Sequence, residues 1–139
     1  MKRADLLTKV MLALMVTAAV AASASAAQPA SSSEPQGRVV LGTVLWTFRA
    51  SAGGFSPAQR ADVCIARSVD ILSDPGVSEK DIKIVVPKRG AEPEIWVGKH
   101  LFVTVTRADA KVNQIDPMSL AKIWARNLDG GLRIAMTAH

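Results

Sequence analysis

Residues 94–106 read EIWVGKHLFVTVT, two apolar arms on either side of Gly98. The arms are rich in β-branched and aromatic residues, and a glycine between two such runs is typical of a β-hairpin turn. Residues 38–49, RVVLGTVLWTFR, repeat this pattern around Gly42. We therefore expect a hairpin in both places, with a single long strand over residues 38–49 as the alternative for the first.

A helix is expected after the first of these hairpins. Ser56 and Gln59 can form a capping box, and Pro57 suits the first helical position, where its missing N–H costs nothing. The helix should end near Asp74, because Pro75 follows. Its expected apolar stripe consists of Ala61, Cys64, Ile65, Ser68, Val69 and Leu72. The charged residues expected to lie away from this stripe are Arg60, Asp62, Arg67 and Asp70.

A second main helix is expected near the C-terminus. Asp116 can cap it and Pro117 can begin it. The pair Gly130-Gly131 should weaken its end, since glycine is a poor helix former. Its expected apolar stripe consists of Leu120, Ile123, Trp124 and Leu128, with Leu132 as a further candidate.

The remaining segments complete the predicted fold. Residues 81–86, DIKIVV, alternate as a half-buried strand does, and residues 107–113 predict a short helical or turn segment. The order of elements is strands, helix, three strands, helix. It predicts an α+β fold in which an antiparallel sheet of about four to five strands carries two main helices on one face. This single domain should occupy residues 38–136.

Residues 1–26 have the organisation of a cleavable export signal. They open MKR and continue with a 13-residue uncharged apolar stretch, residues 10–22, which is shorter than the ~20 residues that a membrane-spanning helix needs. Small residues then allow cleavage after Ala26 or Ala27. An uncleaved membrane anchor is the alternative. Residues 27–37 are rich in Ser and Pro and predict a flexible linker, so the domain is expected in the periplasm or secreted.

The net charge of +5 overstates the basicity of the domain. Three cations and one carboxylate within residues 1–26 account for +2 of it, which leaves +3. The remaining basic residues are scattered and there is no tyrosine, so no nucleic-acid partner is expected. A single cysteine excludes an intrachain disulfide, and the domain must be held together by its core.

Few residues could carry chemistry. The histidines, His100 and His139, and the single cysteine have no zinc-binding spacing, so neither a metal nor a cofactor is expected. Cys64 lies on the apolar stripe and is interpreted as a buried thiol rather than a reactive thiolate. His100 is interpreted as an exposed strand residue. No nucleophile elbow or phosphate-binding loop accompanies it, so a small hydrolase built on His100 is only an alternative to a protein without catalytic residues.

The three tryptophans, Trp46, Trp96 and Trp124, are the candidate contacts for a partner. Core packing is one interpretation of them. The other is that one of them anchors a partner protein, because tryptophan is enriched at binding hot spots.

Several stretches form a longer pattern when they are taken in order. They are VLGTVLW at 40–46, GFSPAQRA at 54–61 with IAR at 65–67, DP at 74–75, IWVG at 95–98, LFVTVTRADA at 101–110 and LAKIWA at 120–125. The pattern covers residues 38–128 and resembles the periplasmic N-terminal region that precedes the membrane helices in some bacterial mechanosensitive channels of the small-conductance family.

The resemblance implies an exported domain that stands alone, because the membrane helices and pore of that family have no counterpart in the sequence. Arg107 stands where the family commonly has an acidic residue, and Cys64 and Gly130-Gly131 are further departures. The expected function is a non-enzymatic periplasmic module, resembling a channel ectodomain. It would mediate protein–protein contact with an envelope or inner-membrane protein, or self-association. The alternative is a periplasmic module that binds anionic lipid headgroups or peptidoglycan, with which a mild positive charge is compatible.

Overall fold

The computed structural model describes residues 37–138. The predicted export signal and nearly all of the predicted linker lie outside these residues, while Gly37, the last residue of that linker, begins the first strand. The elements confirm the α+β class. In chain order they are β1 (Gly37–Leu41), β2 (Thr43–Phe48), α1 (Pro57–Leu72), the 3-10 turn η1 (Glu79–Asp81), β3 (Ile82–Val85), β4 (Glu94–Val97), β5 (His100–Thr104), α2 (Arg107–Asn113) and α3 (Pro117–Thr137).

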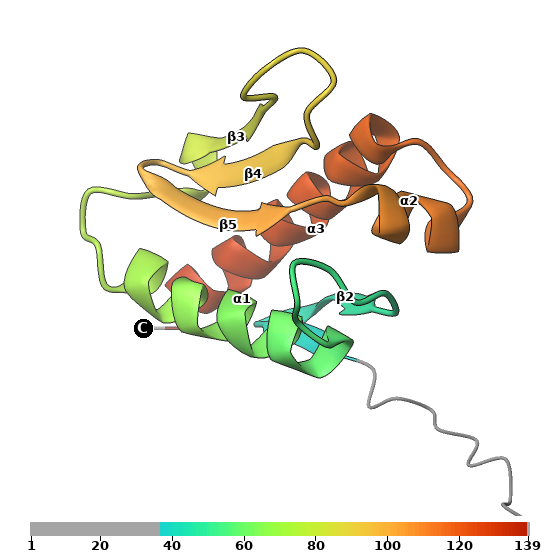
Figure 1. Ribbon diagram of the computed structural model, residues 1–139. Helices are drawn as coiled ribbons and strands as arrows, with labels where there is room; N and C mark the ends of the chain where they lie inside the picture. The colour runs from blue at the N-terminus through green and yellow to red at the C-terminus, as the bar shows by residue number, and fades with distance from the viewer. Residues whose placement is uncertain (1–36, 139) are drawn as a thin grey trace, which may run out of the picture. The chain divides into compact units, whose positions relative to one another are not determined.

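The strands form two antiparallel sheets, so the prediction of one sheet of about four to five strands is wrong. β1 pairs with β2, and the second sheet has the order β3-β4-β5. α1 contacts β1, β2 and β5, and α3 contacts strands of both sheets (Figure 1). Because α1 packs against both β1 and β5, the first hairpin is held by helix packing instead of by pairing with the second sheet. The two main helices therefore contact both sheets rather than one face of a single sheet.

Both expected hairpins are present, which excludes the single long strand over residues 38–49. Gly42 lies between β1 and β2 with φ of +67°, and Gly98 lies between β4 and β5 with φ of +59°. These are left-handed backbone conformations that a side chain would disfavour, and they explain why a glycine stands at each turn.

The second strand of each hairpin holds one residue more than the strand with which it pairs, because the register shifts once within the hairpin. The extra residue is Leu45 in β2 and Phe102 in β5. Such a bulge turns two successive side chains toward the same side of the sheet. The successive pairs that are buried in this way are Leu45-Trp46 and Phe102-Val103.

α1 begins as predicted. Ser56 Oγ accepts a hydrogen bond from the Gln59 N–H, and the Gln59 side chain accepts one from the Ser56 N–H. This reciprocal pair confirms the capping box, and Pro57 is the first helical residue. The helix ends at Leu72, close to the expected end near Asp74.

The buried face of α1 is rotated relative to the predicted stripe. Ile65, Val69 and Leu72 are exposed, so their assignment to the stripe is wrong. Two polar residues are buried because they have hydrogen-bond partners: Arg60 pairs with Asp109, and Ser68 donates to the Ile65 carbonyl. The buried residues of α1 are Pro57, Arg60, Ala61, Cys64, Ser68 and Ile71.

α3 begins with the predicted cap, Asp116, whose side chain accepts from the Ser119 N–H. It then continues through the glycine pair to Thr137, so the predicted weakening does not end the helix there. Ile123 is exposed, so its assignment to the apolar stripe of this helix is wrong. A Cβ at Gly131 would lie 2.5 Å from Leu45 Cδ2 and 2.6 Å from the Leu41 carbonyl oxygen. The missing side chain lets α3 approach the first hairpin closely, and this packing outweighs a helix-propensity cost of about 1 kcal/mol.

The core centres on an aromatic cluster that joins three elements. Trp46 of β2 stacks on Trp124 of α3, with ring centroids 4.6 Å apart and planes 6° apart. Phe102 of β5 meets Trp46 edge-on at 5.7 Å, and Phe48 meets Trp124 edge-on at 5.5 Å. Both hairpins and the last helix therefore share one core.

Candidate functional site

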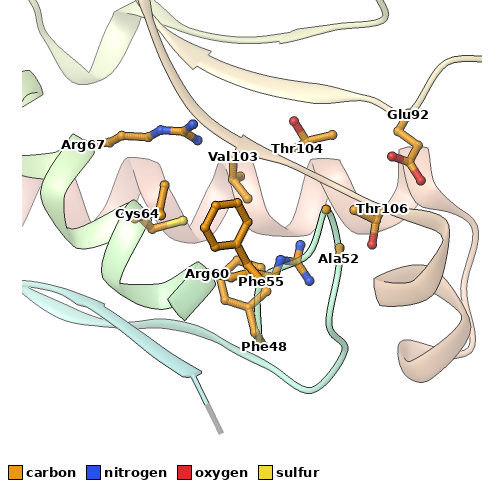
Figure 2. A pocket seen from close by; sticks show the side chains of 12 residues that line it. Phe48, Ala52, Phe55, Arg60, Cys64, Arg67, Glu92, Val103, Thr104 and Thr106 are labelled. Carbon is orange, nitrogen blue, oxygen red and sulfur yellow. The ribbon is translucent and has the colours of Figure 1, made fainter. Parts of the chain in front are cut away.

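A pocket of about 550 Å³ opens between α1, β5 and the loop that joins β2 to α1. This volume lies within the range of about 300–1,000 Å³ that small-ligand sites occupy. Figure 2 shows Arg67 and Glu92 on opposite sides of the pocket, with Val103, Thr104 and Phe55 between them. Phe55 is 49% exposed, which gives the pocket an aromatic rim that is open to solvent.

The outer edge of β5 faces this pocket. β5 is the last strand of its sheet and pairs with β4 alone. The Val105 N–H donates to the carbonyl of Pro93, just before β4, at 2.8 Å. Successive residues of a strand direct their backbone groups to opposite edges, so Thr104 directs its N–H and C=O away from β4 and toward the pocket that it lines. Within residues 37–138, neither group bonds to a loop or a side chain.

The carbonyl of Phe102 points to the same edge and does have partners. It accepts a hydrogen bond from Arg67 Nη1 at 3.0 Å and a weak one from Cys64 Sγ at 3.7 Å. Both donors come from α1. The edge of β5 is therefore closed by α1 at Phe102 and open two residues later at Thr104.

Arg67 has unused hydrogen-bond donors in this pocket. A guanidinium has five N–H groups, and one nitrogen of Arg67 is used by the Phe102 carbonyl. No carboxylate of residues 37–138 forms an ion pair with Arg67. The side chain can therefore receive an anionic group that enters the pocket.

Arg60, which also lines the pocket, is already paired with a carboxylate. Its Nη1 and Nη2 donate to the two carboxylate oxygens of Asp109, each at 2.7 Å, and Nη1 also donates to the Ala50 carbonyl at 2.8 Å. Its guanidinium carbon lies 4.1 Å from the centre of the Phe48 ring. Asp109 in turn accepts from the N–H and Oγ1 of Thr106. This buried ion pair joins the end of β2, α1 and α2, and sequence reasoning missed it.

Glu92 forms the side of the pocket opposite Arg67 (Figure 2). Its Oε1 accepts from the Arg107 N–H at 2.9 Å, and Arg107 Nη2 donates to the Gly90 carbonyl at 2.9 Å. Arg107 therefore holds the loop between β3 and β4. Within residues 37–138, Glu92 forms no ion pair, so its carboxylate can face a cationic group.

Cys64 is a buried, free thiol, which confirms the interpretation drawn from the sequence. Burial raises the pKa of this thiol to about 12. The thiol is therefore protonated at neutral pH and supplies no nucleophile to the pocket that it lines.

His100 lies beside the turn of the β4–β5 hairpin and does not line the pocket. Its Nε2 lies 2.9 Å from Asp74 Oδ2, and Lys99 Nζ lies 3.0 Å from the same oxygen. Hydrogen bonds from His100, Lys99 and the Gly76 N–H hold the pKa of Asp74 well below its usual value of 3.8. His100 is thus half-buried in a polar network, which corrects the expectation of an exposed strand residue.

The three tryptophans lie in different environments. Trp46 and Trp124 are buried in the aromatic cluster, where no partner can reach them in the folded domain. Trp96 is half-buried on β4, and its Nε1–H donates to Glu94 Oε2 at 2.9 Å. None of the three lines the pocket, whereas Phe55, Arg67 and Thr104, which sequence reasoning did not select, do.

Two classes of site are not found in the described part of the chain. Among residues 37–138, no three His, Cys, Asp or Glu side chains are gathered so that they could hold a metal. Over the same range, no helix combines the length and the apolar character needed to cross a bilayer. His139 lies outside the described residues.

Fold and site together define a small α+β domain with one sheet edge left open to a pocket. The chain belongs to a family described as a domain of unknown function (DUF8459), whose model matches residues 38–135. No curated protein and no solved structure matches the chain. Since the family description names no activity, the resemblance to the periplasmic region of mechanosensitive channels stays a prediction.

Proposed function

We propose that the domain is a non-enzymatic binding module of the cell envelope, exported to the periplasm, that binds an extended segment of another envelope protein at the outer edge of β5. The observation that carries this proposal is the pair of unpartnered backbone groups of Thr104, which face a pocket. An unpaired strand edge is a template for another chain, and main-chain hydrogen bonds to such an edge are a recurring mode of peptide recognition.

The loop opposite β5 supports this mode of binding. Ala52 and Phe55 exchange backbone hydrogen bonds of 3.1 and 3.0 Å, which ties the loop into a fixed bend. Phe55 is an aromatic surface at the rim of the pocket. An incoming segment would therefore meet main-chain groups on one side and apolar side chains on the other.

The side chains that line the pocket favour binding over catalysis. Nucleophilic catalysis needs an activated nucleophile beside a base. The thiol of Cys64 is protonated at neutral pH, and the charge of Arg60 is paired with Asp109. The described histidine, His100, lies outside the pocket.

Photo-cross-linking in intact cells tests the proposal. A benzophenone side chain at Phe55 replaces one exposed aromatic group by another at the rim of the pocket, and Ile123 on α3 is the matched control, since it is 44% exposed and does not line the pocket. We expect Phe55 to capture one envelope protein that Ile123 does not. Thr104→Pro should abolish that capture, because it removes the outward N–H and leaves the bonds to β4 in place.

The proposal is contradicted if the probes at Phe55 and Ile123 capture the same protein equally. It is also contradicted if the probe at Phe55 still captures that protein when Thr104→Pro is folded. The mass of the captured species decides between a different protein and a second copy of this chain. Lipid or glycan adducts at Phe55 without a protein adduct would instead support the headgroup or peptidoglycan alternative, which stays a prediction.

A further inference from the structure

We infer that the segment bound at β5 runs antiparallel to this strand and ends in a free carboxylate opposite Arg67. This inference rests on the proposed function and adds the direction and the chemistry of the ligand. It follows from the positions of two charged side chains along the open edge.

The two charges lie at opposite ends of the edge. Arg67 bonds to the carbonyl of Phe102, in the middle of β5. Glu92 bonds to the N–H of Arg107, just beyond the C-terminal end of β5. A strand that pairs antiparallel with β5 brings its C-terminus toward Arg67 and its N-terminus toward Glu92. A parallel strand would bring its terminal carboxylate toward the carboxylate of Glu92.

The length of the edge limits the ligand to a short segment. From Phe102 to Thr106 there are four residue steps, which span about 13 Å at about 3.3 Å per residue of strand. An extended segment of about four residues covers this distance. The residue opposite Thr104 would exchange two backbone hydrogen bonds with it, as a hydrogen-bonded antiparallel pair does.

The carboxylate recognition is assigned to Arg67 rather than to Arg60. Arg60 already holds Asp109 in a two-pronged ion pair with side chains only 9% and 2% exposed. Arg67 is only partly buried and, among residues 37–138, is paired with no carboxylate. A planar guanidinium with unused N–H groups matches the geometry of a carboxylate.

A ¹⁵N NMR titration tests the inference, and its sample is the ¹⁵N-labelled protein purified from the cells that produce it. The probes are the tetrapeptide Ala-Val-Ala-Val with both ends free, the same peptide with an amidated C-terminus, and the same peptide with an acetylated N-terminus. We expect the free peptide to shift the Thr104 amide and the amidated peptide to bind about tenfold more weakly, because one charge-assisted interaction is lost. Acetylation should weaken binding less, because an ammonium group cannot form the two parallel hydrogen bonds that join a guanidinium to a carboxylate.

Arg67→Gln separates carboxylate recognition from a structural effect. Glutamine keeps an N–H donor for the Phe102 carbonyl but loses the positive charge. In this variant the free and amidated peptides should bind equally, and Arg67→Lys should restore part of the difference. Arg126→Gln, an exposed arginine of α3 outside the pocket, is the control and should leave the difference unchanged.

Equal affinity of the wild-type chain for the free and amidated peptides at Thr104 would overturn the inferred carboxylate contact while leaving the proposed function standing. A preference for the free peptide that survives Arg67→Gln would also overturn it. If no peptide shifts the Thr104 amide, the inference fails, and the Phe55 cross-linking experiment decides separately whether the proposed function fails with it.

Discussion

The two hairpins, β1–β2 and β4–β5, are built on the same local plan and are completed in different ways. Each has a glycine turn and one extra residue in its second strand. The carbonyl of that extra residue accepts a side-chain hydrogen bond from a helix in both cases: Asn127 of α3 donates to Leu45, and Arg67 of α1 donates to Phe102. The first donor is a neutral amide, whereas the second is a cation at the side of a pocket.

Both hairpins contribute to the core, and the helices beside each one decide whether it also keeps a strand edge open beside a pocket. Both α1 and α3 pack against the two strands of the first hairpin. The second hairpin keeps one sheet edge directed into a pocket at Thr104. Three substitutions test this contrast between the hairpins, and they are taken in order of decreasing change in stability.

The largest loss of stability is expected at the ion pair that connects the ends of the two hairpins. Arg60 contacts Phe48 and Ala50 at the end of the first hairpin and Asp109 after the second. Asp109→Ala leaves the Arg60 charge buried without its partner and should lower the free energy of unfolding by about 3–5 kcal/mol. Urea denaturation at neutral pH measures this loss.

A double variant serves as the control for this ion pair. Arg60→Met combined with Asp109→Leu removes both charges and should be more stable than Asp109→Ala alone, because no unpaired charge remains buried. A loss of less than about 1 kcal/mol for Asp109→Ala would contradict the account of this link.

A smaller effect is expected at the closure of the first hairpin. Gly131→Ala places a Cβ 2.5 Å from Leu45 Cδ2 and should cost about 1–3 kcal/mol through overpacking. Gly130→Ala is the matched control, because a Cβ there meets nothing within 4 Å. It should stabilise the helix by about 0.5–1 kcal/mol. Thermal unfolding should show a lower Tm for Gly131→Ala and a higher Tm for Gly130→Ala than for the wild type. Equal shifts in Tm would show that α3 does not pack closely on this hairpin.

The smallest effect is expected at the turn of the second hairpin. Asp74 accepts hydrogen bonds from His100 and Lys99 at this turn, and they lower its pKa from the usual 3.8. A lowered pKa contributes stability that is present above pH 3.8 and is lost as the pH falls below that value. Asp74→Asn should therefore be slightly less stable than the wild type at pH 6, and the gap should narrow as the pH falls from about 4 towards 2, because the pKa of Asp74 in the folded protein lies well below 3.8. A gap that is constant across this range would contradict the link.

The sequence predicts the parts of the fold that depend on local chemistry. The capping residues Ser56, Gln59 and Asp116 and the turn glycines Gly42 and Gly98 all act as expected, because each needs only its immediate neighbours in the chain. The separation of the strands into two sheets could not be predicted in this way, since it depends on where α1 packs.

The site is harder to predict because its parts are assembled from distant segments. Arg60 and Asp109 are 49 residues apart, and neither carries a signal that it is buried. Thr104 is an ordinary strand residue in the sequence, and only the order of strands makes its backbone an open edge. The three tryptophans were the candidate contacts in the sequence, yet Trp46 and Trp124 are buried in the core.

The proposed function requires that the edge of β5 is open at Thr104 in the free chain and is closed by a bound segment. Amide hydrogen exchange, measured by NMR on the chain alone and with the unblocked Ala-Val-Ala-Val peptide, tests it directly. We predict that the Thr104 amide exchanges much faster than those of Val103 and Val105 in the free chain, and that it becomes protected when the peptide is bound. The proposal is contradicted if, in the free chain, the Thr104 amide is as well protected from exchange as the amides of Val103 and Val105. It is also contradicted if the Thr104 amide stays unprotected when the peptide is bound at saturation.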